Sequence, residues 1–368
     1  MPFIDKLDDE FLEYLEDLET VECKWLKVGN EYKLYVRDKD PDELYSRFLR
    51  EYEPVSILGQ GTYGCVFEAK EIRGKEGGRT RTYPMAVKRI PVKSVCDIKT
   101  PAEHPEMMYT FAFNQALKGN FMHPGVLIYF YAWYEQPPYG WQRRIDTKLM
   151  KKMKLEPSCS SMLFNYRDDS EFVYIAMELC KSNLADWLKA NTSRDLDRMK
   201  SWIRQIASAV AYLHRYGVIH RDLKPGNIFF AGDDHLKVGD LGSTGNLTKI
   251  RDQSAHIADD RTFGVGTEMY MAPEQPGWVD YSSKVDVFAL GLIFTELCVC
   301  MPSDVKETVF DNYRAGRPNS ILDHLPEEKA FVYWLTIVDQ NSRPSSAEVL
   351  QHPVLAQAEK EIMAQSSG

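Results

Sequence analysis

The segment HRDLKPGN, residues 220–227, decides how the chain is interpreted. It places an acid at Asp222, a cation at Lys224 and a carboxamide at Asn227 around the stiff turn at Pro225. A carboxylate can accept a proton from a hydroxyl, an ammonium group can neutralise a phosphate, and an amide oxygen is a hard metal ligand. Phosphoryl transfer needs these three roles. A lone His-x-Asp would more often be a solvated polar turn, so it is the whole segment that indicates a catalytic loop.

A hairpin with a glycine-rich tip is predicted from ILGQGTYGCVFEAK, residues 57–70. Its GxGxxG spacing is made by three glycines, Gly59, Gly61 and Gly64. That spacing alone is weak, because it also marks dinucleotide sites in which a helix follows the glycines. Here β-type runs lie on both sides, and glycines let backbone amides approach phosphates closely. A third strand carries Lys88, twenty-four residues after Gly64. Such a lysine is usually a surface residue, but behind this hairpin it is placed to reach nucleotide phosphates.

A short hairpin is expected after the catalytic loop, from the runs 228–230 and 236–238. It delivers Asp240, thirteen residues beyond Asn227. A lone acid after a strand is more often a turn residue than a ligand. A hairpin of this length can, however, bring the carboxylate back beside the amide, and Mg²⁺ takes oxygen ligands. Asn227 and Asp240 are therefore candidate metal ligands.

The polar segment 243–271 ends in Ala-Pro-Glu at residues 272–274. Loops of this length in a compact domain tend to be functional. Arg221 can receive a phosphate placed on a hydroxyl of the segment and so order it. The hydroxyls are those of Ser243, Thr244, Thr248, Ser254, Thr262 and Thr267.

Composition and charge describe a soluble globular protein of 368 residues, with 44% hydrophobic and 27% charged residues. The net charge of −9 argues against non-specific binding of nucleic acid by the whole surface. The seven cysteines include no CxxC pair, which favours reduced thiols, and we expect a cytoplasmic protein. The amino terminus is acidic where a secretion signal would be basic, and no apolar run is long enough for a membrane span.

Two regions lie outside these motifs. Residues 1–50 read as an acidic appendage with an amphipathic helix over 3–18, strand-like residues 25–37 and a short helix from Asp40 to Phe48. The appendage either covers a neighbouring lobe or contacts a partner. Residues 136–171 are basic with little periodicity, which predicts a mobile surface loop, or else a docking site for an acidic or phosphorylated partner.

The remaining segments predict one helix before the insertion and mostly helices after a buried strand at 172–180. The first helix covers about 105–118. The later ones are expected near 184–189, 196–216, 283–300, 305–314, 327–338 and 346–356.

The motifs GQGTYG, AVK, HRDLKPGN, DLG and APE, and Arg343 in NSRPSSAE, follow one another in the order typical of eukaryotic protein kinases. From Tyr52 to Leu355 the chain resembles this family. The resemblance implies an α+β, bilobal protein kinase fold, with a small antiparallel β lobe that has one main helix and a larger, mainly helical lobe. The implied domains are an appendage (1–50), a kinase domain (51–357) and a tail (358–368). Within the kinase domain we expect a small lobe (51–178, with the insertion 136–171) and a large lobe (179–357).

The same resemblance implies that the chain binds ATP and Mg²⁺. The implied nucleotide-binding residues are Gly59, Gly61, Gly64, Val66, Ala86, Lys88, Met177, Glu178 and Cys180. Met177 would line the adenine pocket, and backbone groups of Glu178 and Cys180 would face the purine edge. The implied catalytic residues are Asp222, Lys224 and Lys88, with Asn227 and Asp240 as metal ligands. Lys224 implies a serine/threonine preference, and Glu274 is expected to pair with Arg343.

A finer resemblance is to the kinases of the alpha subunit of translation initiation factor two, nearest to the PERK-like branch. It is carried by residues 46–70, YFYAWYEQPPYGWQ at 129–142, MELCKSNLADWL at 177–188 and VGTEMYMAPEQ at 265–275. The resemblance implies translational repression under stress, activating autophosphorylation at Thr262 near Thr267, and a homodimer formed through the small lobes.

Two departures from this family leave alternatives open. Asn114 stands where active kinases have a glutamate that pairs with the lysine. Residues 303–307 do not reproduce the substrate-docking helix. A pseudokinase that regulates such a kinase, or a serine/threonine kinase with another substrate, therefore remains an alternative.

Overall fold

The computed structural model describes residues 24–28, 31–35, 46–61, 64–76, 79–92, 123–155, 163–241, 245–246, 268–277 and 282–355. The described residues fall into two compact units. The first unit holds those up to 92 and those of 133–174, and the second unit holds 123–132 and 175–355. The predicted helices over 3–18 and 105–118, together with Asn114, Thr262 and Thr267, lie outside the described residues.

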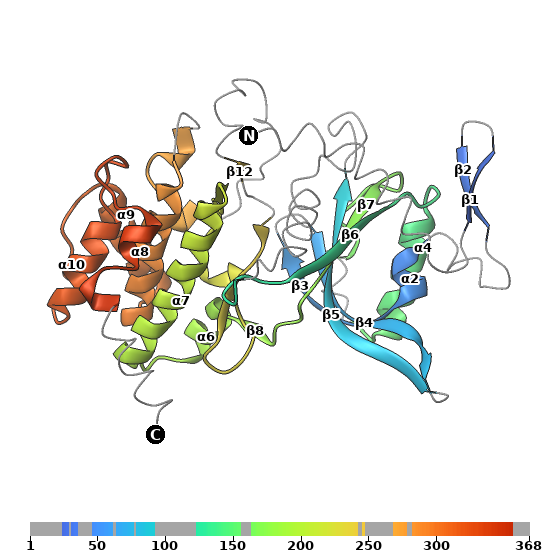
Figure 1. Cartoon of the computed structure of the whole chain (residues 1–368), viewed down its shortest axis with the longest axis horizontal. Coiled ribbons are helices and arrows are strands. Elements are labelled where there is room, and N and C mark those ends of the chain that lie inside the picture. Colours follow the sequence, from blue (N-terminus) through green and yellow to red (C-terminus); the bar gives the residue numbers. More distant parts are fainter. Residues whose placement is uncertain are drawn as a thin grey trace. The chain divides into compact units, whose positions relative to one another are not determined.

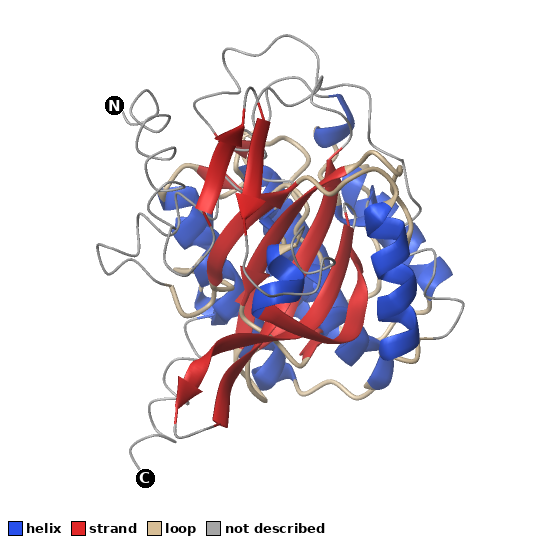
Figure 2. Cartoon of the chain, turned by 90° about the vertical axis from the view of Figure 1, so that its right-hand side faces the viewer, coloured by secondary structure: helices blue, strands red, loops and turns tan. Residues whose placement is uncertain are grey.

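A five-stranded sheet carries most of the first unit (Figures 1 and 2). Its order is β3-β4-β5-β7-β6, and β4 pairs antiparallel with both β3 and β5. The strands are β3 (Tyr52–Gly61), β4 (Gly64–Glu76), β5 (Arg79–Val92), β6 (Tyr129–Glu135) and β7 (Glu171–Met177). This sheet confirms the predicted antiparallel β lobe.

Side-chain alternation explains why these segments form strands. In β4 the buried residues Cys65, Phe67 and Ala69 alternate with partly exposed ones, which is the period of a strand with one face in the core. Every residue of β7 is buried, as expected for an inner strand covered on both faces. On the buried side Trp133 stacks between Tyr52 and Tyr174, with ring centroids 5.4 and 5.1 Å away.

The predicted insertion contains a helix, α4 (Trp141–Lys152), and the prediction of a mobile surface loop is wrong for these residues. The buried side of α4 consists of Trp141, Ile145 and Leu149, packed against Leu49. The sequence signal is weak because this stripe has only one apolar residue per turn. It is also interrupted by an acid, Asp146, which is fully buried.

The appendage joins the first unit at α2 (Arg47–Glu51), which is capped by the Ser46 hydroxyl accepting from the N–H of Leu49 at 3.3 Å. The helix expected from Asp40 therefore begins seven residues later within the described part of the chain. Further upstream, β1 (Lys24–Val28) and β2 (Glu31–Tyr35) pair as an antiparallel hairpin, which confirms the strand-like pattern there.

The second unit is mainly helical, as predicted. Its central helix α8 is apolar on every side because α7 and α10 both pack against it. The Asn183 side chain caps α6 by accepting from the N–H of Asp186 at 2.9 Å. The helices are α6 (Leu184–Ala190), α7 (Leu196–Arg215), α8 (Lys284–Cys298), α9 (Ser303–Arg314), α10 (Pro326–Leu335) and α11 (Ser346–Val349).

Short strands of the second unit hold the catalytic loop. They form a three-stranded sheet in the order β11-β10-β8 and a β9–β12 pair. The bounds are β8 (Ser182–Asn183), β9 (Val218–Ile219), β10 (Ile228–Phe230), β11 (Leu236–Val238) and β12 (Gly245–Asn246). Within the described residues, no helix has both the length and the apolar character needed to span a membrane.

Candidate active site

The catalytic loop runs from β9 through a 3-10 turn, η3 (Pro225–Asn227), into β10. Within it the Nζ atom of Lys224 lies 2.7 Å from the Oδ2 atom of Asp222. The Nδ2 atom of Asn227 donates to the Asp222 carbonyl at 2.8 Å and to its Oδ2 at 3.1 Å. Two donors therefore fix the carboxylate of Asp222. Because both bonds use Nδ2, the amide of Asn227 keeps its oxygen as a hard ligand.

Asp240 is positioned by the residue before it. The N–H of Gly239 donates to the carbonyl of Asn227 at 2.9 Å, and the carbonyl of Gly239 lies 2.9 Å from Nε2 of His220. A Cβ at position 239 would come within 2.8 Å of Leu127, so only glycine fits. Asp240 itself has φ of 57°, an uncommon value for a non-glycine residue that often marks functional positions. The predicted return of Asp240 toward Asn227 is thus supported by the backbone.

Asp286 at the start of α8 holds the main chain of the loop. Its Oδ2 accepts from the N–H of His220 at 2.8 Å and its Oδ1 from the N–H of Arg221 at 2.9 Å. His214 lies 2.8 Å from Oδ2. Burial would raise the pKa of Asp286, but the hydrogen bond and charge of His214, aided by His220, hold that pKa below its ordinary value. Sequence reasoning noted this acid without its role; an acid inside an otherwise apolar helix was the available signal.

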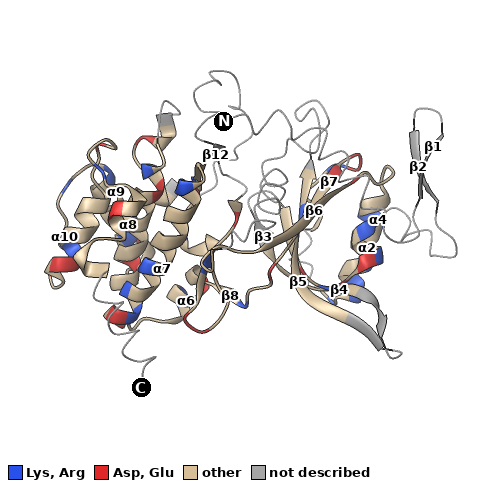
Figure 3. Ribbon diagram, in the orientation of Figure 1, with Lys and Arg blue, Asp and Glu red and all other residues tan. Residues whose placement is uncertain are grey.

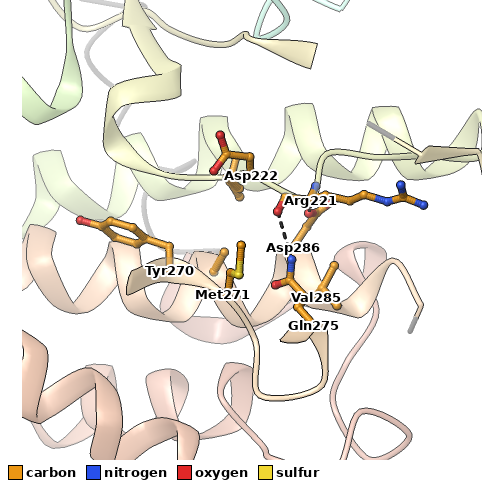
Figure 4. A pocket seen from close by; sticks show the side chains of 9 residues that line it. Arg221, Asp222, Tyr270, Met271, Gln275, Val285 and Asp286 are labelled. Atoms are coloured by element: carbon orange, nitrogen blue, oxygen red, sulfur yellow. Dashed lines mark hydrogen bonds between the residues drawn. The ribbon is translucent and has the colours of Figure 1, made fainter. Parts of the chain in front are cut away.

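A pocket lies beside the loop in the second unit (Figure 4). Nε2 of Gln275 donates to the Arg221 carbonyl at 3.0 Å, and its Oε1 accepts from the N–H of Ala272 at 2.7 Å. These bonds tie the Ala-Pro-Glu segment, between the 3-10 turns η5 (Glu268–Tyr270) and η6 (Gln275–Gly277), to the catalytic loop. The pocket is lined by Arg221, Asp222, Leu223, Tyr270, Met271, Gln275, Val285, Asp286 and Ala289.

The predicted pairing of Glu274 with Arg343 is confirmed. Nη1 of Arg343 lies 2.7 Å from Oε1 of Glu274, and Nη2 donates to Oε2 at 3.2 Å. Arg343 is buried and also donates to three carbonyl groups. The pair therefore fixes the end of the Ala-Pro-Glu segment within the second unit.

The first unit brings together the predicted phosphate-binding residues on neighbouring strands. In the β3–β4 pair Gly59 lies opposite Val66 and Gly61 opposite Gly64. In the β4–β5 pair Val66 lies opposite Lys88, which is buried. Ala86 lies one pair along, opposite Glu68. A Cβ at position 64 would come within 2.0 Å of the Arg89 carbonyl oxygen, so Gly64 is required for β4 to approach β5.

The segment after β7 carries the residues predicted to face the purine. Met177 is buried. The N–H of Glu178 donates to the Ile128 carbonyl at 2.9 Å, so only its carbonyl remains of the two backbone groups proposed for the purine edge. The Glu178 carboxylate accepts from Nζ of Lys237 at 2.7 Å. Burial, with the nearby charge of Glu178, raises the pKa of the Cys180 thiol to about 11.

The fit of Mg²⁺ can be judged from the donor atoms. Asn227 contributes an amide oxygen whose orientation is fixed through Nδ2, and Asp240 contributes a carboxylate next to the tethered Gly239. All of these are hard oxygen ligands, which Mg²⁺ prefers over nitrogen or sulfur. The residues present therefore fit this ion.

An antiparallel sheet carrying a glycine hairpin and a buried lysine, and a helical unit carrying an Asp-Lys-Asn loop, define a protein kinase. The family model described as protein kinase domain matches residues 52–355, and the chain belongs to that family. The fold class expected from the motifs is thereby confirmed.

Individual relatives are kinases of one kind. The chain is 42% identical over 206 residues to eukaryotic translation initiation factor 2-alpha kinase pek-1 of Caenorhabditis elegans, covering 52% of this chain and 19% of that protein. It is 31% identical over 314 residues to the interferon-induced, double-stranded RNA-activated protein kinase of Mus musculus, covering 84% and 52%. It is 35% identical over 228 residues to eIF-2-alpha kinase GCN2 of Homo sapiens, covering 54% and 13%. The chain thus spans about half or less of these relatives, and the finer resemblance is confirmed.

Proposed function

We propose that the chain is a serine/threonine protein kinase that transfers the γ-phosphoryl group of ATP to a protein hydroxyl. The observation that carries this proposal is the arrangement of Asp222, with its carboxylate held by Lys224 and Asn227 and its loop held by Asp286. A carboxylate oriented in this way is ready to accept a hydroxyl proton, and preorganised groups of this kind lower the barrier to transfer.

Each residue has a distinct role in the proposed reaction. Asp222 orients the substrate hydroxyl and accepts its proton, and Lys224 stabilises the charge of the phosphoryl group in transfer. Asn227 and Asp240 would hold Mg²⁺, which when bound neutralises phosphate charge. Lys88 contacts the phosphates from β5, beneath the glycine hairpin.

The proposed substrate is the alpha subunit of translation initiation factor two, phosphorylated under stress to repress translation. Support comes from the relatives, since those from Caenorhabditis elegans and Homo sapiens are named as kinases of this subunit. We also propose a cytoplasmic location, a homodimer through the first unit, and autophosphorylation at Thr262 with Thr267 nearby.

The test is transfer of labelled phosphate from Mg²⁺-ATP by the purified chain, to itself and to the alpha subunit, with Asp222→Asn as control. Labelling of both by the wild type and of neither by the variant is expected, with Thr262 among the labelled sites. Self-labelling alone would move the substrate elsewhere. Activity retained by Asp222→Asn would overturn the role given to Asp222.

One observation favours a second candidate, a pseudokinase that binds and regulates a related kinase. Asn114 can hydrogen-bond an ammonium group, but it cannot neutralise it as a glutamate would. Nucleotide binding without any labelling would support this candidate. Raised activity of Asn114→Glu would instead show that the missing charge limits an active enzyme.

A further inference from the structure

The exposed side of α4 is almost entirely basic (Figure 3). Its only acid, Asp146, is buried against Arg89, and its apolar residues face the first unit. The charged side is therefore displayed by a helix whose other side is fixed. The exposed positions are Arg143, Arg144, Thr147, Lys148, Lys151 and Lys152, with Lys154 just beyond the helix.

Nearby acids compensate only part of this charge. Asp168 lies 2.6 Å from Nε of Arg143, at the start of the helix. Asp169 pairs with Arg167, so its charge is already balanced. Lys151 and Lys152 lie at the other end of α4, in its last turn, and both are exposed. A concentrated positive charge on a helix surface attracts acidic ligands.

The negative charge of the chain is concentrated in another place. Residues 1–22 hold nine of the 54 Asp and Glu residues but only one of the 45 Lys and Arg residues. Residues 23–368 therefore hold 45 acids and 44 basic residues, and are close to neutral. Almost the whole net charge of −9 belongs to the first 22 residues.

The covalent connection favours an encounter between these two charged segments. The chain enters the first unit at α2, and Leu49 of α2 packs against the buried side of α4. A linker of the ten residues 36–45 reaches at most about 35 Å, and α4 with its twelve residues is about 18 Å long. The acidic segment is thus tethered beside the basic helix, and tethering raises its effective concentration there to about the millimolar range.

We propose that residues 1–22 dock on the basic side of α4 in the same chain. The contact is electrostatic, between the carboxylates of the segment and the ammonium groups that include Lys151 and Lys152. Several exposed ion pairs act together in such a contact, and each is weakened by salt. The proposal concerns a contact of the chain with itself and does not depend on kinase activity.

The first experiment uses the full chain and a zero-length carbodiimide, which joins a carboxylate to an amine that it touches. Cross-links from residues 1–22 to Lys151 and Lys152, located by mass spectrometry, are expected in 50 mM salt and should fall by about fivefold in 0.5 M salt. In a mixture of ¹⁵N-labelled and unlabelled protein these cross-links should join peptides of one isotope only. Mixed pairs would assign the contact to a second copy and overturn the proposal.

A matched pair of variants separates a specific contact from general attraction. Lys151→Glu with Lys152→Glu should remove cross-linking of the segment to the remaining lysines of α4. Lys70→Glu with Lys189→Glu changes the same charge at two exposed positions outside α4, and should leave cross-linking unchanged. Equal effects of both pairs, or no cross-link to α4 in the wild type, would overturn the proposal.

A second measurement does not depend on carboxylate chemistry. Acetylation of Lys151 and Lys152 in the full chain, quantified by mass spectrometry, should be about threefold faster when Asp8→Asn, Asp9→Asn and Glu10→Gln remove charge from the segment. Acetylation of Lys70 and Lys189 should not change. An unchanged rate at Lys151 and Lys152 would show that residues 1–22 do not cover them, and an additive or another protein in the sample cannot mimic the dependence on these three acids.

Discussion

Arg89 and Asp146 form a buried two-pronged ion pair, with Nη1–Oδ1 at 2.7 Å and Nη2–Oδ2 at 2.8 Å. The hydroxyl of Tyr166 and the amide of Gln142 donate to the same carboxylate at 2.5 and 3.0 Å. Arg89 also donates to the carbonyl of Leu163 at 3.0 Å. Since Arg89 follows Lys88 in β5, this pair fastens α4 to the strand that carries the proposed phosphate-binding lysine.

Breaking the pair with Asp146→Ala should lower the free energy of unfolding by about 3–5 kcal/mol, because Arg89 would remain buried without its counter-ion. Urea denaturation followed by circular dichroism measures this loss. The control is Asp169→Ala, which removes an exposed pair with Arg167 and should cost about 1 kcal/mol or less. Similar losses in the two variants would contradict the role given to the buried pair.

The two outer glycines of the hairpin should respond differently to a methyl group. Gly64→Ala places Cβ 2.0 Å from a backbone oxygen of β5, which cannot rotate away, whereas Cβ at Gly59 meets nothing within 4 Å. We expect Gly64→Ala to weaken ATP binding about tenfold, by separating β4 from β5 near Lys88, and Gly59→Ala to weaken it less. Equilibrium titration with a fluorescent ATP analogue measures both. A larger effect of Gly59→Ala would show that approach to the phosphates, and not strand spacing, sets the requirement.

Asp286 should make the protein more sensitive to acid. Its pKa in the folded protein is lowered below the ordinary 3.8, so the folded state binds the proton less readily than the unfolded chain. The resulting stability is fully present above about pH 3.8 and is lost as pH falls through the lower folded pKa.

Unfolding free energies measured from pH 6 down to pH 2 test this assignment. The wild type should lose more stability over the acid limb than Asp286→Asn, although the variant is less stable at neutral pH. Parallel pH profiles of the two proteins would contradict it.

Cys180 should react slowly with alkylating reagents at neutral pH. Its pKa of about 11 leaves little thiolate, which is the reactive form. Iodoacetamide labelling followed by mass spectrometry should show a rate that rises about tenfold per pH unit between pH 8 and 10. Exposed Cys300 serves as the reference within the same sample. Rapid labelling of Cys180 at pH 7 would show that its surroundings are more polar than the structure indicates.

The sequence predicted the parts of the fold that depend on local pattern. The helix over 196–216 was predicted because its apolar residues repeat with helical spacing, and α7 follows these bounds closely. The hairpin that returns Asp240 toward Asn227 was predicted from two short β-type runs and a turn, and its register is Ile228 opposite Val238.

The rest could not be predicted because the decisive contacts join residues far apart in the sequence. Asp146 reads as a surface acid in a basic helix until its partner, Arg89, is known, 57 residues away. Asp286 accepts from backbone N–H groups, which carry no sequence signal. The commitment of the Glu178 N–H to Ile128 is likewise a backbone contact that residue types do not reveal.

The attachment of the catalytic loop to α8 has a consequence for hydrogen exchange. The amide protons of His220 and Arg221 are both bound by a carboxylate on the most completely buried helix of the second unit. Such protons can exchange with deuterium only when that helix opens, and opening it dismantles the core around it. The reactive end of the loop thus belongs, in exchange kinetics, to the slowest class of amides in the second unit, although the residues on either side of it carry the chemistry.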